Sequence, residues 1–226
     1  MWKFFSIDGP IVNGIDRWTS LVWLNILTTF CCVPIITAGA SLTAMHCVVF
    51  RISKGEELAV TKVFFHAFKD NFKESTLIWG VYFVLLGLLV CGCGIILING
   101  WKLQTITWAF FGILVTMMLL LVNWTFILQS RYDNDPINII KNAIIVGLIY
   151  LQYSLIFAVT MAIPILLLIY AMKILPVTLA FWFTAPAYVQ AKLYGNVFDR
   201  LEEMDRQMQK AKQMADTQQA NHNEKD

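Results

Sequence analysis

The chain has 226 residues, of which 58% are hydrophobic and only 14% are charged. A soluble domain carries about 25% charged residues, so this composition and the long uncharged stretches predict an integral membrane protein. Apolar and polar residues do not alternate strictly, which excludes an outer-membrane barrel and predicts membrane helices. The net charge of +2 gives no indication of a nucleic-acid partner.

The N-terminal part is predicted to approach the membrane and then enter it. Residues 1–17 mix aromatic and polar side chains and are expected to form an interfacial lead-in, with Asp8-Gly9-Pro10 marking the start of a helix. A first span is predicted over Trp18–Ile36, ended or kinked by a proline near its end. Thr37–Ile52 is barely long enough to cross, and it is either a tilted further span or a re-entrant segment. It would pack tightly through its small residues, which are Gly39, Ala40, Ser41 and Ala44.

The stretch Leu58–Ile98 changes character halfway along. Over residues 58–74 the apolar residues share one helical face and the lysines lie mostly on the other, which predicts an amphipathic helix. This helix has three interpretations. It lies on the inner leaflet with its lysines near anionic lipid, or it packs on the protein's own inner ends, or it inserts phenylalanines into a partner. The candidate partner-binding phenylalanines are Phe64, Phe68 and Phe72. Ser75–Asn99 follows without a charge and is long enough to span the bilayer.

Three further spans are predicted over Gln104–Ser130, Ala143–Met172 and Ile174–Leu193. Ala143–Met172 is too long for a straight crossing and contains Pro164, which predicts tilt or a kink. The polar connector before it contains Asp135-Pro136, a helix start.

These elements together predict an all-α, polytopic helical membrane bundle with five firm spans, or six if Thr37–Ile52 crosses. The membrane domain is expected over residues 18–194, with the amphipathic helix 58–74 on its inner surface. Residues 195–226 are expected to form a cytoplasmic C-terminal helix and a disordered tail.

The positions of lysine and arginine predict the orientation. With both ends inside and Thr37–Ile52 crossing, 15 of the 17 lysines and arginines lie inside, and only Lys102 and Lys173 lie outside. If Thr37–Ile52 does not cross, the N-terminus moves outside and the split becomes 13 to 4. The distribution favours cytoplasmic termini.

The interior of the firm spans holds no Asp, Glu, Lys or Arg. Ion-coupled transporters usually keep an ionisable group at membrane depth, and no Gly-x4-Gly-Lys-Ser/Thr phosphate loop is present. The five cysteines lie in apolar segments without the companions that a metal site needs. We expect no enzyme, cofactor or metal site. A membrane enzyme using His46 and Asp133 is a distant hypothesis.

Gly80, Gly87 and Gly94 recur every seven residues and form a glycine stripe along the span Ser75–Asn99. Small residues allow another helix to approach closely in lipid. The stripe either packs against the protein's own spans or docks another subunit.

Three sequence strings together resemble the YesL family of bacterial membrane proteins. They are residues 34–44 (PIITAGASLTA), 64–73 (FFHAFKDNFK) and 131–134 (RYDN), the last with Asp133 where the family pattern has Glu. The resemblance covers about residues 1–198. The family has no established enzymatic activity, so the resemblance implies none here. The resemblance also implies an association with ATP-binding-cassette importers for complex carbohydrates in Gram-positive bacteria. The expected function is therefore a non-catalytic accessory membrane subunit or assembly factor that binds the permease subunits of such an importer.

The alternative function is a small channel or carrier for a neutral solute. Uncharged polar side chains within or beside the spans could line its path, although such residues also hold helices together. They are Asn25, Asn99, Asn123, Gln129 and Gln152.

Overall fold

The computed structural model describes residues 10–98, 104–132, 135–170 and 182–195, residues 198 and 199, and five single positions up to residue 214. Residues 1–9 of the interfacial lead-in, the turn at residues 99–103, the first part of the predicted span Ile174–Leu193 (residues 174–181) and most of the predicted tail lie outside the described residues.

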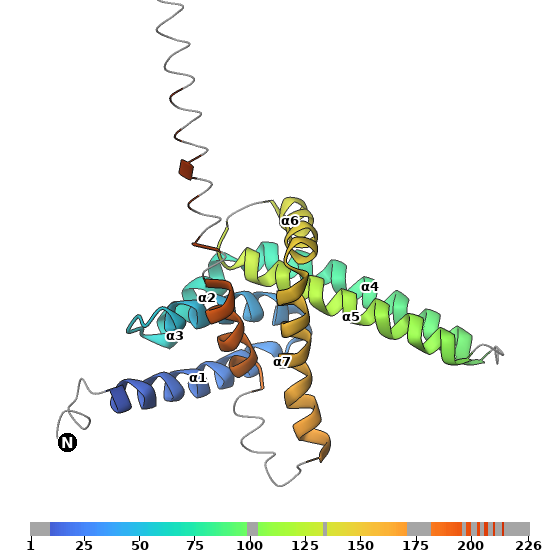
Figure 1. Cartoon of the computed structure of the whole chain (residues 1–226), viewed down its shortest axis with the longest axis horizontal. Helices are drawn as coiled ribbons and strands as arrows, with labels where there is room; N and C mark the ends of the chain where they lie inside the picture. Colours follow the sequence, from blue (N-terminus) through green and yellow to red (C-terminus); the bar gives the residue numbers. More distant parts are fainter. Residues whose placement is uncertain are drawn as a thin grey trace, which may run out of the picture.

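The described chain is helical, without a strand (Figure 1). The elements in order are α1 (Pro10–Cys32), the 3-10 turn η2 (Ile35–Thr37), α2 (Ala38–Ser53), α3 (Val60–Asp70), α4 (Phe72–Ile98), α5 (Gln104–Gln129), α6 (Pro136–Ile149) and α7 (Leu151–Tyr170). A further helix, called here the C-terminal helix, covers residues 184–195. The predicted helix starts at Pro10 and at Pro136 are confirmed. Proline suits the first helical position, because a backbone N–H there would have no partner within the helix.

Three helical segments in the described residues are long and apolar enough to cross a membrane: Ile35–Ser53, Phe72–Ile95 and Trp108–Gln129. Helices α6 and α7 provide a fourth candidate span if they are counted together as one bent span. The predicted five or six spans are therefore not seen. Helix α1 ends at Cys32, and the part after Arg17 is only 15 residues long, short of the roughly 20 that a straight crossing needs.

The chain bends by 94° between α6 and α7, at Tyr150. The predicted kink in Ala143–Met172 is thus present but not at Pro164, which lies within the continuous α7. The bend is held by Trp124 of α5. Its indole nitrogen donates to the Ser154 hydroxyl at 2.8 Å, and that hydroxyl lies 3.2 Å from the carbonyl oxygen of Gly147 on the other side of the bend.

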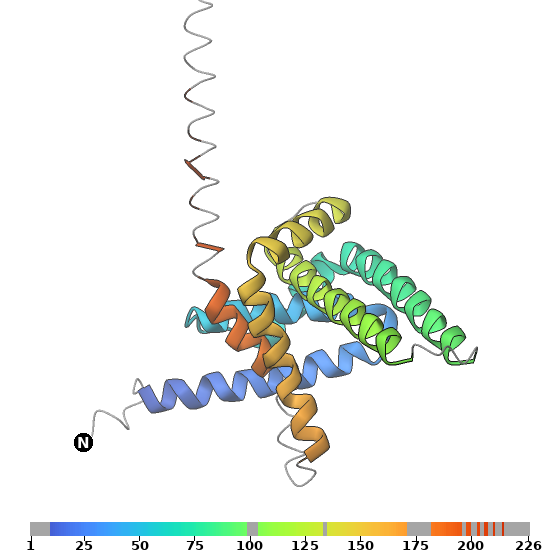
Figure 2. The same ribbon diagram turned by 45° about the vertical axis from the view of Figure 1, so that its right-hand side comes forward.

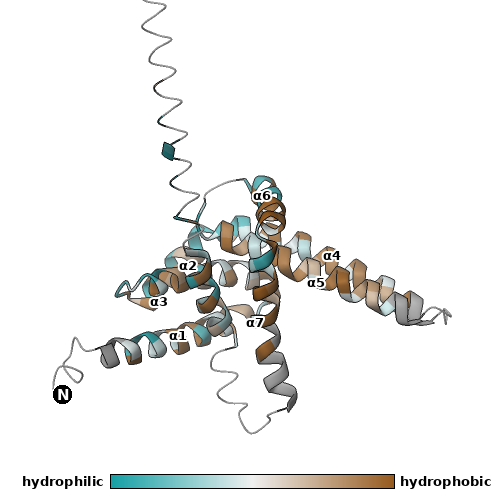
Figure 3. Ribbon diagram, viewed as in Figure 1, coloured by the Kyte–Doolittle hydropathy of each residue, from teal (hydrophilic) through white to brown (hydrophobic). Residues whose placement is uncertain are grey.

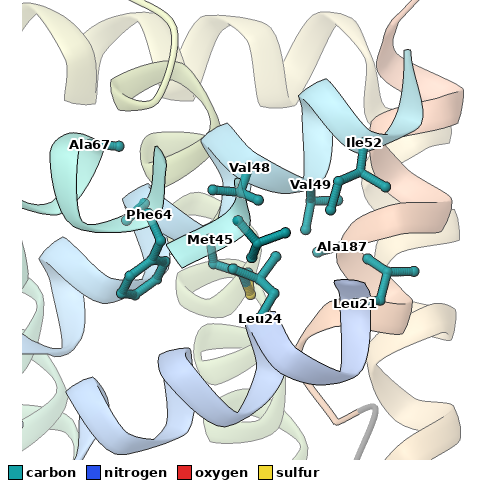
Figure 4. Close-up of a cluster of buried hydrophobic side chains, with 11 residues drawn as sticks. Leu21, Leu24, Met45, Val48, Val49, Ile52, Phe64, Ala67 and Ala187 are labelled. Carbon is teal, nitrogen blue, oxygen red and sulfur yellow. The ribbon is translucent and has the colours of Figure 1, made fainter. Parts of the chain in front are cut away.

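The molecule divides into a compact part and an extended part (Figures 1 and 2). Helices α1, α2 and α3 pack with the C-terminal helix around one apolar cluster, which we call the N-terminal core. It includes Leu21, Leu24, Met45, Val48, Val49, Ile52, Phe64, Ala67 and Ala187 (Figure 4). Helices α4 and α5 run side by side away from this core as a hairpin whose far ends lie free of the other helices.

The core and the hairpin meet where α2 crosses the first turns of α4. A Cβ on Gly39 would lie 2.5 Å from the Ser75 carbonyl oxygen and 2.7 Å from the Trp79 Cβ, so only glycine allows this approach. Thr43 and Ser75 share a hydroxyl hydrogen bond of 2.9 Å. The predicted tight packing is confirmed, because Gly39, Ala40, Ser41 and Ala44 are all buried.

Helix α2 contacts the same end of the hairpin along much of its own length. Near its start, Gly39 and Thr43 meet Ser75. Near its end, the Phe50 ring stacks against the guanidinium of Arg131, which follows α5, at 3.9 Å. Helix α2 therefore lies across the base of the hairpin, where Phe72 begins α4 and Arg131 follows α5.

Hydropathy follows this division (Figure 3). Helices α4, α5 and α7 are mainly apolar, and polar residues collect on α3 and around the base of the hairpin. Polar residues thus collect at one end of an otherwise apolar hairpin.

Candidate interaction site

Helix α3 confirms the predicted amphipathic helix and shows which face it buries. Its buried residues are Val60, Phe64 and Ala67, the i, i+4, i+7 face expected from the sequence. The helix ends at Asp70 and is capped by Asn71, whose side-chain amide donates to the Ala67 carbonyl oxygen at 3.0 Å. Helix α4 begins at the next residue, so the amphipathic helix leads directly into the hairpin.

The three candidate phenylalanines do not form one free face. Phe64 is fully buried in the N-terminal core, Phe68 is partly buried against it, and Phe72 is 39% exposed. The rings of Phe68 and Phe72 lie with their centroids 5.5 Å apart. The burial of Phe64 and Phe68 agrees with the interpretation in which α3 packs on the protein's own helices. Of the three candidates, only Phe72 remains accessible to a partner.

The outer side of α3 combines lysines with aromatic surface. Lys62, Phe65, His66 and Lys69 line an open groove of about 570 Å³ together with Trp23 of α1. The Trp23 indole nitrogen donates to the Thr61 hydroxyl at 2.9 Å, which fixes α3 beside α1. Lysines and aromatic rings together are typical of the membrane interface.

The glycine stripe faces open space. Nothing within the described chain lies within 4 Å of where a Cβ would stand on Gly80, Gly87 or Gly94. Gly92, off the stripe, faces α5 instead, with the Phe111 ring 3.7 Å from its Cβ position. The interpretation that the stripe packs against the protein's own spans is therefore wrong for the described residues.

The hairpin as a whole is open to its surroundings. Only 11% of the candidate span in α4 and 28% of that in α5 are buried inside the protein, against 61% for Ile35–Ser53. The two helices are joined by a hydrogen bond of 2.8 Å between the Tyr82 and Thr125 hydroxyls and by the Trp79–Phe126 ring contact. Most of the outward surface of α4 is thus available to lipid or to another protein.

A set of contacts at the base of the hairpin, called here the inner seam, joins α4 to α5 and connects Arg131, which follows α5, to Phe50 of α2 and to Phe198. The Gln129 amide donates to the Glu74 carboxylate at 2.8 Å. Arg131 lies between the rings of Phe50 and Phe198, at 3.9 and 4.6 Å from their centroids. These side chains come from distant parts of the sequence. Gln129 could be singled out from the sequence as a polar residue beside a span and Arg131 as part of the RYDN string, but no local signal predicted their partners.

His46 lines a small enclosed cavity of about 20 Å³ beside the inner seam, together with Ser130, Arg131 and Gln190. A cavity of this size has room for about one water molecule. Asp133 lies outside the described residues, so its pairing with His46 stays a prediction. The described residues contain no group of three or more His, Cys, Asp or Glu side chains placed to hold a metal ion.

The uncharged polar residues proposed to line a solute path are dispersed. The Asn25 side-chain oxygen accepts the Phe183 backbone N–H at 3.0 Å, and Gln129 belongs to the inner seam. Gln152 is exposed on α7, and Asn99 lies outside the described residues. Asn25 and Gln129 thus hold helices together, and the neutral-solute carrier stays a prediction.

Comparison with known proteins gives one match. Residues 18–93 match the sequence model of a family described as "Protein of unknown function, DUF624", the domain family to which YesL belongs. The match runs from α1 into α4 and includes two of the three strings that carry the resemblance, with the RYDN string beyond it. No curated protein and no solved structure matches the chain.

Proposed function

We propose that this chain is a non-catalytic accessory subunit or assembly factor of another membrane protein, namely the permease subunits of an ATP-binding-cassette importer for oligosaccharides. The observation that carries the docking part is the open glycine stripe on α4. The choice of an importer rests on the resemblance to the YesL family and on the family match over residues 18–93.

Exposure alone does not identify a docking surface, because an apolar helix face is at home in lipid. The glycines supply the further argument. Each costs about 1 kcal/mol of helix stability relative to alanine, and the described chain gains no close contact from Gly87 or Gly94 in return. Helices associate in membranes through such stripes of small residues, so a helix of another subunit is the occupant that would use them.

The proposal includes a multi-pass protein in the bacterial cell membrane with both termini in the cytoplasm. The Arg17 guanidinium lies 3.3 Å from the position that a Cβ on Gly55 would take, so the start of α1 and the loop after α2 lie together. Because α2 lies across the base of the hairpin, the contacts support the re-entrant alternative for Thr37–Ile52. The N-terminus stays in the cytoplasm in this arrangement, because the part of α1 after Arg17 is also too short to cross.

Cysteine labelling tests this orientation. In a cysteine-free background, a cysteine at Lys102 should react with an impermeant reagent applied to intact cells. Cysteines at Thr37, Lys54 and Arg131 should not react. Labelling at Thr37 would show that α2 crosses the bilayer, and labelling at Lys3 would place the N-terminus outside.

Purification of the tagged protein in mild detergent tests the docking. We expect the permease and solute-binding subunits of a carbohydrate importer to co-purify, and Gly87→Leu to reduce their recovery several-fold. Gly112→Leu is the matched control, because Gly112 on α5 also has nothing within 4 Å of its Cβ position. Equal recovery with both variants would mean that the stripe has no docking role.

A growth experiment tests the importer. Deleting the gene should slow growth on a complex glycan and leave growth on glucose unchanged. Normal uptake of several candidate glycans by the deletion strain would contradict the assignment. A contribution from α3 is best tested with Phe65→Ser and Phe72→Ser, because these rings are 41% and 39% exposed whereas Phe64 belongs to the core.

A further inference from the structure

The inner end of α4 carries a groove of about 690 Å³, which we call the Lys73 groove. It is lined by Lys73, Thr76, Leu77, Gly80, Val81, Val84 and Leu85. We propose that this groove binds one anionic phospholipid of the inner leaflet, with the phosphate at Lys73 and an acyl chain along Gly80. This site is separate from the docking role proposed for Gly87 and Gly94.

The length of the groove corresponds to one leaflet. From Lys73 to Leu85 the helix advances 12 residues, or about 18 Å at about 1.5 Å per residue. One leaflet contributes about 15 Å of hydrocarbon to a bilayer core of about 30 Å. An acyl chain anchored at Lys73 would therefore extend as far as Leu85 and leave Gly87 and Gly94 beyond its end.

The shape of the groove comes from Gly80. Leu77, Gly80 and Val84 follow one another on one face of α4, and the two flanking side chains are 62% and 61% exposed. Gly80 leaves a notch between them with nothing within 4 Å of its Cβ position. A flexible hydrocarbon chain is the kind of group that lies in a shallow apolar notch of this form.

The charge at the groove's inner end selects an anionic headgroup. Lys73 is exposed and takes part in neither of the two ion pairs found in the described residues, Lys54–Asp199 and His66–Asp70. The adjacent carboxylate of Glu74 accepts a hydrogen bond from Gln129 on α5.

Helix α3 adds two further exposed lysines, Lys62 and Lys69, shortly before the groove in the sequence. Lysines near an anionic membrane surface are attracted to it electrostatically. The same lysines would offer little to an apolar helix of another protein, which makes a lipid the better occupant of this end of the stripe.

Native mass spectrometry of the full-length protein in detergent tests the site, with phosphatidylglycerol and phosphatidylcholine of identical acyl chains as probes. We expect one bound phosphatidylglycerol, retained several-fold more than phosphatidylcholine. Lys73→Gln should lower phosphatidylglycerol retention to the phosphatidylcholine level. Lys141→Gln, which removes an exposed lysine on α6, should leave it unchanged.

Substitutions that fill the notch at Gly80 distinguish lipid binding in the groove from simple attraction of lipid to surface charge. Gly80→Leu should reduce retention of both lipids, and Val84→Trp should do the same by a second route. Gly87→Leu should leave lipid retention unchanged even where it abolishes partner recovery, so the two proposals fail independently.

Three results would overturn the lipid site. They are equal retention of the two lipids by the unmodified protein, equal effects of Lys73→Gln and Lys141→Gln, and unchanged retention in folded Gly80→Leu. A lipid-free dimer that Gly80→Leu disrupts would assign the groove to a second copy of the chain.

Discussion

Phe64 and Leu88 are both large apolar residues on helices, yet Phe64 is fully buried and Leu88 is 66% exposed. The first belongs to the N-terminal core and the second to the α4–α5 hairpin. In the core, α1, α2, α3 and the C-terminal helix bury their apolar faces against one another. In the hairpin, apolar side chains point away from the protein along most of its length. The core side chains therefore stabilise the fold by packing on one another, whereas most side chains of the hairpin are placed to contact lipid or another protein.

The strongest way to test this division is to remove one large side chain from each part. Phe64→Ala should cost about 3–5 kcal/mol, because it leaves a cavity among tightly packed neighbours. Leu88→Ala should change the free energy of unfolding by no more than about 0.5 kcal/mol, as is usual for exposed positions. Denaturant unfolding in detergent, followed by circular dichroism, measures both. Similar losses for the two variants would mean that the hairpin is packed within the protein.

Glycine substitution probes the same division at smaller side chains. Gly39→Ala should cost about 1–3 kcal/mol, because α2 must move away from the Ser75 carbonyl to accept a Cβ. Gly87→Ala should leave stability unchanged or raise it slightly, since alanine favours helix and has open space there. Thermal unfolding of the purified variants distinguishes the two. A destabilised Gly87→Ala would indicate a close contact within the chain.

The smallest effect is expected at the half-exposed ion pair between Lys54 and Asp199. Lys54 and Asp199 form an ion pair of 3.1 Å with side chains 42% and 52% exposed. A half-exposed pair of this kind contributes about 0.2–1 kcal/mol and is screened by salt. A double-mutant cycle with Lys54→Gln and Asp199→Asn should give a coupling energy in that range that falls at high salt. A larger, salt-independent coupling would make this pair a principal link between the residue that follows α2 and Asp199.

The contrast between the two parts also explains which features of the fold could be predicted from the sequence. In α3 the polar and apolar residues separate onto two faces, so the buried positions Val60, Phe64 and Ala67 could be predicted as one face. The pattern does not say whether that face meets the chain itself or a partner, and Phe64 proved to belong to the chain's own core. Pro10 and Gly39 mark local features that were predicted correctly, whereas Pro164 lies within the continuous α7 and does not mark the bend.

In α4 the residues are apolar all round, and no pattern shows which side meets α5. Gly92, not the glycine stripe, faces Phe111. The bend at Tyr150 depends on Trp124 of another helix, and Arg131 lies between Phe50 and Phe198, far from both in the sequence. Such features are set by tertiary contacts between distant residues, and a single sequence does not reveal them.

The central claim is that the open stripe of α4 docks another membrane protein, and photo-cross-linking in intact membranes tests it most directly. A photoreactive amino acid would be placed at Gly87 and, as the matched control, at Gly112, which is equally open on α5. We expect a cross-link from position 87 to an integral membrane subunit of a carbohydrate importer, with little or none from position 112. Cross-links from position 87 only to lipid, or the same products from both positions, would contradict it.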